Sequence, residues 1–113
     1  MNDDRQLRTL DRRLEPYAAA LLQVIQGYQP NVYITSARRG RKEQLTLYLR
    51  AQRGQSRYPA AFPGTSKHER GLAFDLGNVD PRLLRAAGRL WESWGGRWGG
   101  RFHDVIHFES GSG

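Results

Sequence analysis

The chain contains no cysteine, and this absence limits the ways in which 113 residues can hold a fold together. Disulfide bridges, thiolate catalysis, zinc fingers and iron–sulfur sites are excluded. Stability must come from one hydrophobic core, for which this length and a hydrophobic content of 38% are sufficient. The longest apolar run, Tyr17–Ile25, is too short to cross a bilayer. Any metal ion must be held by carboxylates and by the three histidines.

We expect a single domain over residues 1–110, followed by a short tail. The tail, residues 111–113, reads Gly-Ser-Gly, which is typical of a flexible end or a cloning remnant. The first residues are acidic, and no hydrophobic stretch of signal-peptide type follows them. We therefore expect the protein to accumulate in the cytoplasm and, if it acts outside, to do so only after the membrane has been permeabilised.

The protein is strongly basic, with a net charge of +7 and sixteen arginines among eighteen basic residues. Such a charge favours polyanionic partners, namely nucleic acid, anionic lipid or an acidic cell envelope. An ordinary basic surface without a specific partner is the alternative. The arginines are scattered and no DNA-binding motif is present, so we expect no nucleic-acid partner. We also expect a monomer that does not insert stably into a membrane.

Hydrophobic periodicity and the placement of glycine and proline predict both helices and strands. Residues 3–28 carry apolar side chains at helical spacing, but Pro16 divides the segment into two helices. In a later helix we expect Leu45, Tyr48 and Leu49 to face inward. The helices are expected at 3–14, 15–28, 41–53 and 81–94, and the strands at 31–36, 71–76 and 105–109. This irregular mixture favours an α+β fold with a small antiparallel sheet flanked by helices.

Two irregular segments are candidates for the walls of a binding site. Residues 54–67 hold two prolines and two glycines and form a loop that is long for so small a domain. Tyr58 and Phe62 in this loop are expected to close over a substrate. Residues 94–102 alternate aromatic residues with glycines, and Trp98 is the candidate for the wall or floor of a cleft.

All three histidines and several carboxylates fall in two short windows, residues 66–75 and 103–109. A hydrolytic zinc takes three ligands from histidine and carboxylate and leaves one position for water. A nearby carboxylate that does not bind the metal accepts a proton from that water. The residues that can fill these places are His68, Asp75 and His107 as ligands and Asp104 as base.

Spacing alone leaves other interpretations of these histidines open. A histidine near a carboxylate is often part of a hydrogen-bonded structural pair rather than a metal ligand. His103 and His107 are four residues apart, which suits two ligands on one helix face, but nearby glycines and β-branched residues argue against a helix. We treat His103 as a residue that supports the site indirectly or lies on the surface.

The segment Ser66–Asp75 fits the pattern S-x-H-x-x-G-x-A-x-D, and Asp104–His107 fits D-x-x-H. These motifs resemble those of the zinc D-alanyl-D-alanine carboxypeptidase and L-alanyl-D-glutamate endopeptidase family, which includes VanY-like peptidases and phage endolysins. Ser36, Arg39 and Gln44 are similar to a third family pattern, S-G-Y-R-S-x-x-x-Q, from which this sequence departs at the Gly, Tyr and second Ser. The resemblance covers nearly the whole chain and implies the Hedgehog/D,D-peptidase fold.

The resemblance implies a role for each matched residue. His68, Asp75 and His107 would hold Zn2+, and Asp104 would take a proton from the attacking water and pass it to the leaving amine. Arg39 would bind a substrate carboxylate or the developing oxyanion. The residues expected to contact substrate or to support the site from behind are Ser66, Ser36, Gln44, Trp98, His103 and Glu109.

We therefore expect a zinc-dependent hydrolase that cleaves the stem peptide of bacterial peptidoglycan. Family carboxypeptidases commonly have Glu at the position of Asp104, so the Asp here, with the segment 94–102 before it, favours an L-alanyl-D-glutamate endopeptidase of phage-endolysin type. A D-alanyl-D-alanine carboxypeptidase with the same site is the alternative. The alternative of another class is a non-catalytic basic module that binds the cell wall or nucleic acid and needs no metal.

Overall fold

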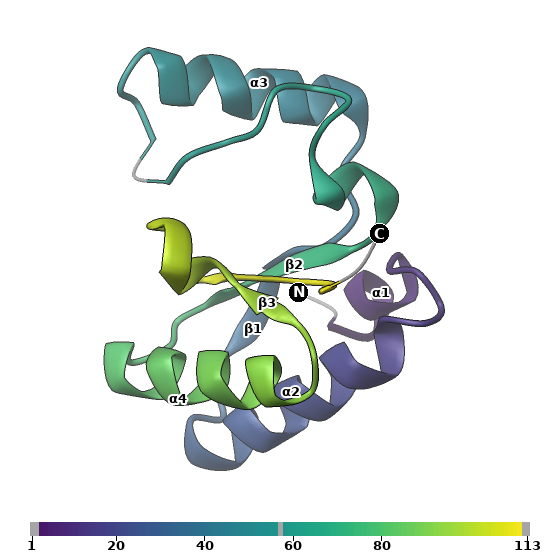
Figure 1. Ribbon diagram of the computed structural model, residues 1–113, viewed down its shortest axis with the longest axis vertical. Helices are drawn as coiled ribbons and strands as arrows, with labels where there is room; N and C mark the ends of the chain where they lie inside the picture. Colours follow the sequence, from purple (N-terminus) through teal and green to yellow (C-terminus); the bar gives the residue numbers. More distant parts are fainter. Residues whose placement is uncertain (1–2, 57, 112–113) are drawn as a thin grey trace.

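A four-stranded antiparallel sheet organises the computed structural model, which describes residues 3–56 and 58–111. The strands lie in the order β1-β2-β4-β3, with bounds β1 Tyr33–Ser36, β2 Ala73–Gly77, β3 Arg97–Trp98 and β4 His107–Glu109. The helices are α1 Asp3–Arg8, α2 Glu15–Tyr28, α3 Arg41–Gln52 and α4 Pro81–Ser93, with the short 3-10 helices η1 Lys67–Arg70 and η2 Gly99–Phe102. In Figure 1, α2 and α4 lie below the sheet and α3 stands above it. The predicted α+β fold with a small antiparallel sheet is confirmed.

Alternation along the strands separates an apolar face of the sheet from a polar one. Directly paired residues share a face, so Phe74 of β2, Phe108 of β4 and Trp98 of β3 point to the same side. That side belongs to the hydrophobic core formed with α2 and α4, where the rings of Phe74 and Phe108 stack with centroids 5.5 Å apart. The opposite side carries a second directly paired couple, Asp75 and His107.

A bulge in β1 changes which of its side chains meets the polar side of the sheet. Ile34 pairs with Leu76 on the core side, but the next paired couple is Ser36 with Asp75. One extra residue on β1, Thr35, is accommodated between these pairs. Ser36 therefore lies beside Asp75, on the side opposite to the core.

The N-terminal segment forms two helices, as predicted, but the first ends earlier than the sequence pattern indicates. α1 stops at Arg8 rather than near the start of α2. The backbone that follows bonds to distant segments: the Asp11 N–H donates to the Gly71 carbonyl at 2.9 Å, and the Arg38 Nε–H donates to the Thr9 carbonyl at 3.0 Å. Groups engaged in this way cannot take part in a helical i→i−4 ladder, so the chain unwinds here.

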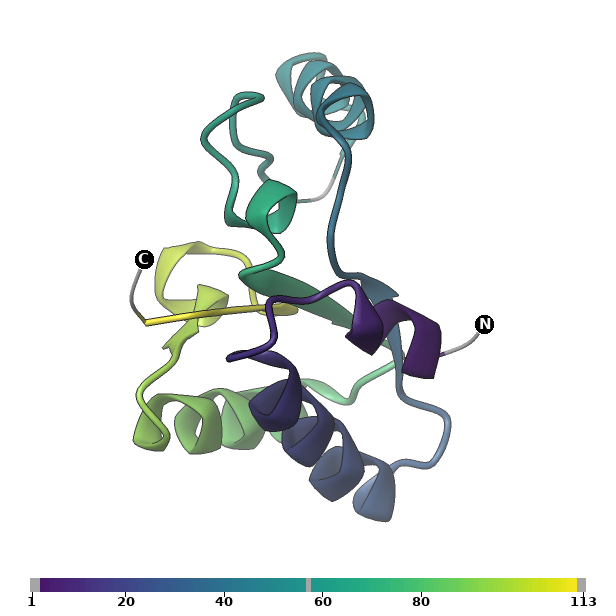
Figure 2. The same ribbon diagram turned by 90° about the vertical axis from the view of Figure 1, so that its right-hand side faces the viewer.

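The helix α3 stands apart from the sheet (Figure 2). The face that it turns inward differs from the predicted one. Leu45 and Leu49 were expected to point inward but are 43% and 39% exposed, whereas Gln44 is fully buried. The Gln44 side chain donates to a carbonyl of the loop after α3 at 2.9 Å, and the Tyr48 ring meets Phe62 of that loop edge-on, with centroids 5.3 Å apart. A polar anchor thus fixes the rotation of α3, which an apolar pattern does not reveal.

The segment 94–102 contains a strand that the sequence analysis did not predict. β3 pairs with β4, and this pairing sets Trp98 opposite Phe108 in the core. Trp98 is 8% exposed and its Nε1–H donates to the Val105 carbonyl at 2.9 Å. Trp98 therefore does not line the cleft around the candidate metal ligands, where the sequence analysis expected it, but borders a second hollow. Its ring fills the place where a side chain on Gly88 of α4 would lie, which explains a glycine in the middle of that helix.

The predicted tail is described only as far as Gly111. Of the predicted tail, residues 112 and 113 lie outside the described residues, and Gly111 lies against the carbonyl of Gly95. Within residues 3–56 and 58–111, no helix is long and apolar enough to cross a membrane. The domain boundary at residue 110 stays a prediction.

Candidate functional site

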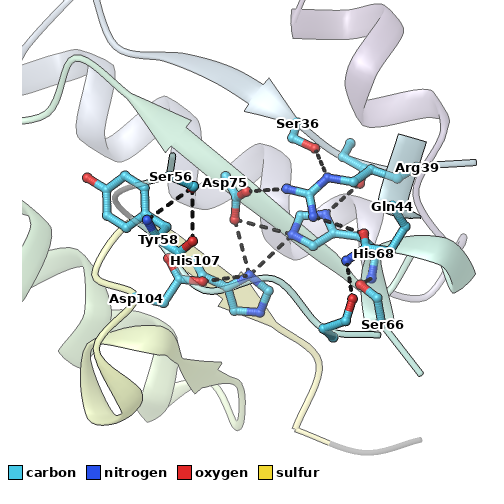
Figure 3. A network of polar contacts seen from close by, with 12 residues as sticks. Ser36, Arg39, Gln44, Ser56, Tyr58, Ser66, His68, Asp75, Asp104 and His107 are labelled. Atoms are coloured by element: carbon cyan, nitrogen blue, oxygen red, sulfur yellow. Dashed lines mark hydrogen bonds and ion pairs between the residues drawn. The ribbon is translucent and has the colours of Figure 1, made fainter. Parts of the chain in front are cut away.

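The polar side of the sheet faces a cleft of about 700 Å³. Its walls come from α3 and the loop after it, from η1, and from the segment that joins β3 to β4. Figure 3 shows that the side chains converge here from elements distant in sequence. The predicted site residues that line the cleft are Arg39, Gln44, Ser66, His68, Asp75, Asp104, His107 and Glu109.

Three buried side chains in this cleft point their donor atoms at one spot (Figure 3). His68 Nε2 lies 3.2 Å from His107 Nδ1 and 3.3 Å from Asp75 Oδ1. His107 Nδ1 lies 3.1 Å from the same Asp75 oxygen. The group of His68, Asp75 and His107 could therefore hold a metal ion.

The outer ring nitrogens of both histidines are occupied by hydrogen-bond acceptors. His68 Nδ1–H donates to the Ala37 carbonyl at 2.7 Å, and His107 Nε2–H donates to Glu109 Oε1 at 2.8 Å. The inner nitrogens of the neutral rings must then carry lone pairs. Two lone pairs and a carboxylate oxygen that face one another need a cation or a proton between them. Two imidazoles and one carboxylate are a donor set that suits zinc and leaves a position open.

A tight turn brings His68 and Asp75 to the same place. Ser66 caps η1 by accepting a hydrogen bond from the His68 N–H at 3.1 Å. Gly71 ends η1 in the left-handed region, with a φ of 71°. The backbone angle favours glycine, and a Cβ on Gly71 would also crowd the backbone, at 3.0 Å from the Asp11 N and 3.1 Å from the Thr9 carbonyl oxygen. Ser66 therefore supports the site through the backbone of a candidate ligand.

Arg39 lies behind Asp75 and is held by three acceptors. Its Nη2–H donates to Asp75 Oδ2 at 2.8 Å, its Nε–H to Ser36 Oγ at 2.9 Å and its Nη1–H to Gln44 Oε1 at 3.2 Å. The arginine thus binds the Asp75 oxygen that does not face the histidines. Ser36 and Gln44 orient Arg39, and through it Asp75.

The paired charges shift the pKa of Asp75 and His107 in opposite directions. Burial alone would raise the pKa of Asp75, but its close contacts with His107 and His68 outweigh burial and hold that pKa well below its usual range. Burial would lower the pKa of His107, but hydrogen bonds to Asp75 and Glu109 raise it to about 9. Without a metal ion, His107 is thus the group that carries the proton between these donor atoms.

Asp104 has the opposite electrostatic environment to Asp75. Its Oδ2 lies 4.0 Å from His107 Nδ1, and its side chain is 14% exposed. Burial and the negative charge of Asp75 raise the pKa of Asp104 to about 6. A carboxyl group with this pKa can accept and return a proton near neutral pH. Asp104 therefore has the properties of a general base.

Glu109 supports His107 from the outer side of the ring. Burial would raise the pKa of Glu109, but hydrogen bonds from His107 and Lys67 lower it to about 2, so the carboxylate stays ionised. A carboxylate bonded to the outer nitrogen of a histidine fixes the ring orientation and makes its inner nitrogen a better ligand. The prediction that Glu109 lies behind the site agrees with this position.

Two cations of the cleft were missed by the sequence analysis. Lys67 Nζ lies 3.0 Å from Glu109 Oε2, and Arg97 Nη1 lies 3.5 Å from the same oxygen. Once Trp98 is assigned to the core, strand alternation turns its neighbour Arg97 to the polar side. A prediction of β3 would therefore have placed Arg97 at the site. The glycine pairs on both sides of this short strand made the segment look like a turn.

Two other predictions concern residues outside the group of donor atoms. His103 is exposed and ends η2 with a φ of 66°, so the surface position is the one observed. Tyr58 of the long loop lines the cleft, and its closure over a substrate stays a prediction. Phe62 of the same loop packs against α3 and is 59% exposed.

A comparison with protein families identifies the group to which this arrangement belongs. The VanY family, described as D-alanyl-D-alanine carboxypeptidase, matches residues 7–103. The chain belongs to this family. The matched range includes Arg39, His68 and Asp75 and ends before Asp104 and His107. The resemblance noted in the sequence is confirmed, and with it the class of peptidoglycan-directed peptidases.

Solved structures of VanY-type peptidases share the fold. A D,D-pentapeptidase VanY mutant from a VanB-type resistance cassette, in complex with Zn(II), matches with a TM-score of 0.64 and 17% identity, over 91% of this chain and 73% of that one. The D,D-dipeptidase VanXYg, in complex with a D-Ala-D-Ala phosphinate analogue, matches with a TM-score of 0.62 and 20% identity, over 91% and 51%.

An L,D-carboxypeptidase, DacB from Streptococcus pneumonia, also has this fold, with a TM-score of 0.56 and 23% identity over 81% of this chain and 62% of that one. The chain therefore spans about half to three quarters of the length of these relatives. At such identities the likeness concerns the fold. No curated protein sequence matches the chain significantly.

Proposed function

We propose that this VanY-family protein is a zinc-dependent D,D-carboxypeptidase that removes the terminal D-alanine from peptidoglycan stem peptides. The observation that carries the proposal is the convergence of His68 Nε2, Asp75 Oδ1 and His107 Nδ1 within 3.1–3.3 Å of one another. The family match to D-alanyl-D-alanine carboxypeptidases supports the substrate, and the zinc-bound VanY relative supports the metal.

The three donor atoms would hold the zinc ion. When bound, zinc supplies a Lewis acid that polarises the scissile carbonyl and lowers the pKa of water. The negative charge that Asp75 contributes is kept in place by Arg39 on its far side, 2.8 Å away. Glu109 keeps the His107 ring in the tautomer whose inner nitrogen is free to bind.

Asp104 would act as the general base and then as the general acid. Its ionised carboxylate takes a proton from water, and the oxygen of that water forms a bond to the carbonyl carbon. The same proton then passes from Asp104 to the amine nitrogen as the C–N bond breaks. The raised pKa of Asp104, about 6, suits both transfers near neutral pH.

Digestion of peptides and of purified peptidoglycan tests the proposal. The enzyme is incubated with a pentapeptide that ends in D-Ala-D-Ala and with purified walls. Each reaction is run with and without chelator, and the products are identified by mass spectrometry. The proposal predicts loss of single D-alanine residues, abolition by chelator and recovery with zinc. A lack of metal-dependent products on all substrates would contradict it and would favour a non-catalytic module.

An L-alanyl-D-glutamate endopeptidase, the activity favoured by the sequence alone, is the second candidate. The family comparison favours the carboxypeptidase, but one feature of the surface suits an endopeptidase. Tyr58 and Ile106 line both the cleft and a second hollow of about 1000 Å³, so a peptide could extend beyond the cleft on that side. New D-glutamyl amino termini in the digestion would identify this activity and would support a phage-type lysis role after membrane permeabilisation.

A further inference from the structure

One end of the cleft carries more positive charge than its own acidic groups neutralise. Lys67 and Arg97 both approach the same oxygen, Glu109 Oε2, at 3.0 and 3.5 Å. The other oxygen of Glu109 accepts the hydrogen bond from His107. Two cations thus share one carboxylate, and one positive charge is left without a negative partner within this group.

Arg97 is the cation of this pair with donors to spare. Lys67 also donates to the Ser110 carbonyl at 2.8 Å, and its side chain is only 18% exposed. For the Arg97 guanidinium, the described part of the chain offers only the contact with Glu109 and a place over the Phe102 ring, 5.7 Å from its centroid. The Arg97 side chain is 57% exposed. A guanidinium has five N–H donors, so most of those of Arg97 remain available to a ligand.

Arg97 lines the cleft, and two contacts connect its exposed guanidinium to the candidate metal site. The Phe102 ring lies under the guanidinium and meets the His107 ring at a centroid distance of 5.9 Å. Glu109 also connects Arg97 with His107: its Oε1 lies 2.8 Å from His107 Nε2, and its Oε2 lies 3.5 Å from Arg97 Nη1. Arg97 is thus connected to the candidate metal ligand His107 through one intervening residue, either Phe102 or Glu109. An extended peptide advances about 3.3–3.6 Å per residue, so a substrate held at the candidate metal ligands needs only a few residues to reach Arg97.

We propose that Arg97, with Lys67 beside it, forms a subsite for a carboxylate of the substrate, next to the reacting bond. A guanidinium binds a carboxylate through two parallel hydrogen bonds, which fixes the position of a peptide end more strictly than a lone charge does. Arg39 cannot serve equally well for this, because Asp75, Ser36 and Gln44 already hold it at the back of the site. Arg97 is then a specificity-determining residue.

A stem peptide offers two carboxylates that could occupy the subsite: the terminal one and that of its D-glutamyl residue. Three versions of one pentapeptide distinguish them, namely the free acid, the C-terminal amide and the D-glutamyl amide. The amide that abolishes the effect of an Arg97 substitution identifies the bound group. Either result, recognition of the terminal carboxylate or of the D-glutamyl carboxylate, supports the proposed subsite.

The test compares kcat and KM of four proteins on these peptides. For Arg97→Gln we expect a KM for the free acid raised about ten- to hundredfold, the range for a lost hydrogen bond to a charged group, with little change in kcat. On one of the two amides the variant should match the wild type. Arg97→Lys should recover part of the loss. The matched control is Arg101→Gln, because Arg101 is also exposed and ion-paired, at 2.8 Å from Glu92, but does not line the cleft.

Two results would overturn the subsite: an Arg97→Gln variant whose KM is unchanged on every peptide, or one that loses the acid and both amides equally. The inference rests on the proposed peptidase function, yet the two can fail separately. If the zinc-loaded wild type cleaves none of the peptides, the proposed function is wrong. Calorimetric binding of the same three peptides to the wild type and to Arg97→Gln then still decides whether Arg97 recognises a carboxylate.

Discussion

Asp104 lies beside the candidate metal ligands but outside the group that could hold the ion. Its Oδ2 is 4.0 Å from His107 Nδ1, and among the described residues only His68, Asp75 and His107 bring their ligand atoms together, so zinc binding should not depend on Asp104. We predict that Asp104→Asn keeps one zinc ion per chain and loses about 10²–10⁴-fold in kcat, the usual contribution of a general base. Metal content by mass spectrometry, measured together with turnover, checks both statements. His68→Ala is the matched variant and should lose zinc and activity together. The reverse pattern would exchange the roles of the two residues.

The proton on His107 should make zinc binding depend on pH. Burial would lower the pKa of His107, but hydrogen bonds to Asp75 and Glu109 and the negative charges of Asp75 and Asp104 raise it to about 9, so the ring is protonated in the metal-free protein at pH 7. Zinc needs the neutral ring, so each bound ion must displace this proton. Zinc affinity should therefore rise by roughly tenfold per pH unit from pH 7 and level off near pH 9.

Calorimetry at pH 7 in buffers of different protonation enthalpy counts the released proton, which should be about one per zinc ion for His107. The control is Glu109→Gln, which keeps a hydrogen-bond acceptor beside His107 Nε2 and removes the charge that raises the pKa. In this variant the release at pH 8 should be smaller. Identical heats in all buffers at pH 7 would mean that His107 is already neutral there.

The elements that position the site could mostly be predicted from the sequence, because their signals are local. Pro16 at the start of α2, and Asp80 and Pro81 at the start of α4, mark helix ends where the structure has them. The ten-residue motif from Ser66 to Asp75 likewise contains its own turn, with Gly71 in the left-handed region. Such features depend on backbone geometry within a few residues, which a sequence displays directly.

The parts that could not be predicted depend on contacts between distant segments. The rotation of α3 follows from the burial of one polar residue, Gln44, which holds a loop carbonyl and Arg39 at the same time. β3 is two residues long and exists because β4 pairs with it. That pairing moved Trp98 from the expected cleft wall into the core and brought Arg97 to the site. No periodicity can appear in so short a strand.

The turn at Gly71 gives a prediction that separates backbone strain from crowding. Gly71 and Gly54 both have a φ of 71°, but a Cβ on Gly71 would contact Arg38, Asp11 and Thr9, whereas Gly54 has open space. Gly54→Ala should cost about 1 kcal/mol of unfolding free energy, the cost of the backbone angle alone. Gly71→Ala should cost about 3 kcal/mol and also weaken zinc binding, because the turn sets His68 against Asp75. Denaturant unfolding and zinc titration of both variants check this, and equal effects would show that crowding at Gly71 is absent.

The net positive charge of the molecule lies on its surface. Among the described residues every arginine except Arg39 is exposed, and the net charge is +7. Attraction to an anionic cell wall should therefore raise activity at low ionic strength and weaken as salt screens it. We predict that turnover on intact walls falls severalfold between low and high salt. Turnover on a short free peptide substrate, which lacks the polyanionic wall, should change little. Equal salt dependence on both substrates would assign the effect to the site rather than to the surface.

Zinc should also stabilise the whole fold, because its candidate ligands tie three parts of the chain together. His68 comes from η1, Asp75 from β2 and His107 from β4, and Arg39 after β1 holds Asp75 from behind. An ion that binds only the folded state at a concentration of 100 times its Kd adds about 2.7 kcal/mol. For a domain of this size that corresponds to a rise in Tm of roughly 10 °C. Thermal unfolding with zinc and with chelator measures the difference, which should disappear in His68→Ala and persist in Asp104→Asn. If both variants kept the full shift, the stabilising ion would bind elsewhere, and the three convergent donor atoms would be a hydrogen-bonded cluster of the core.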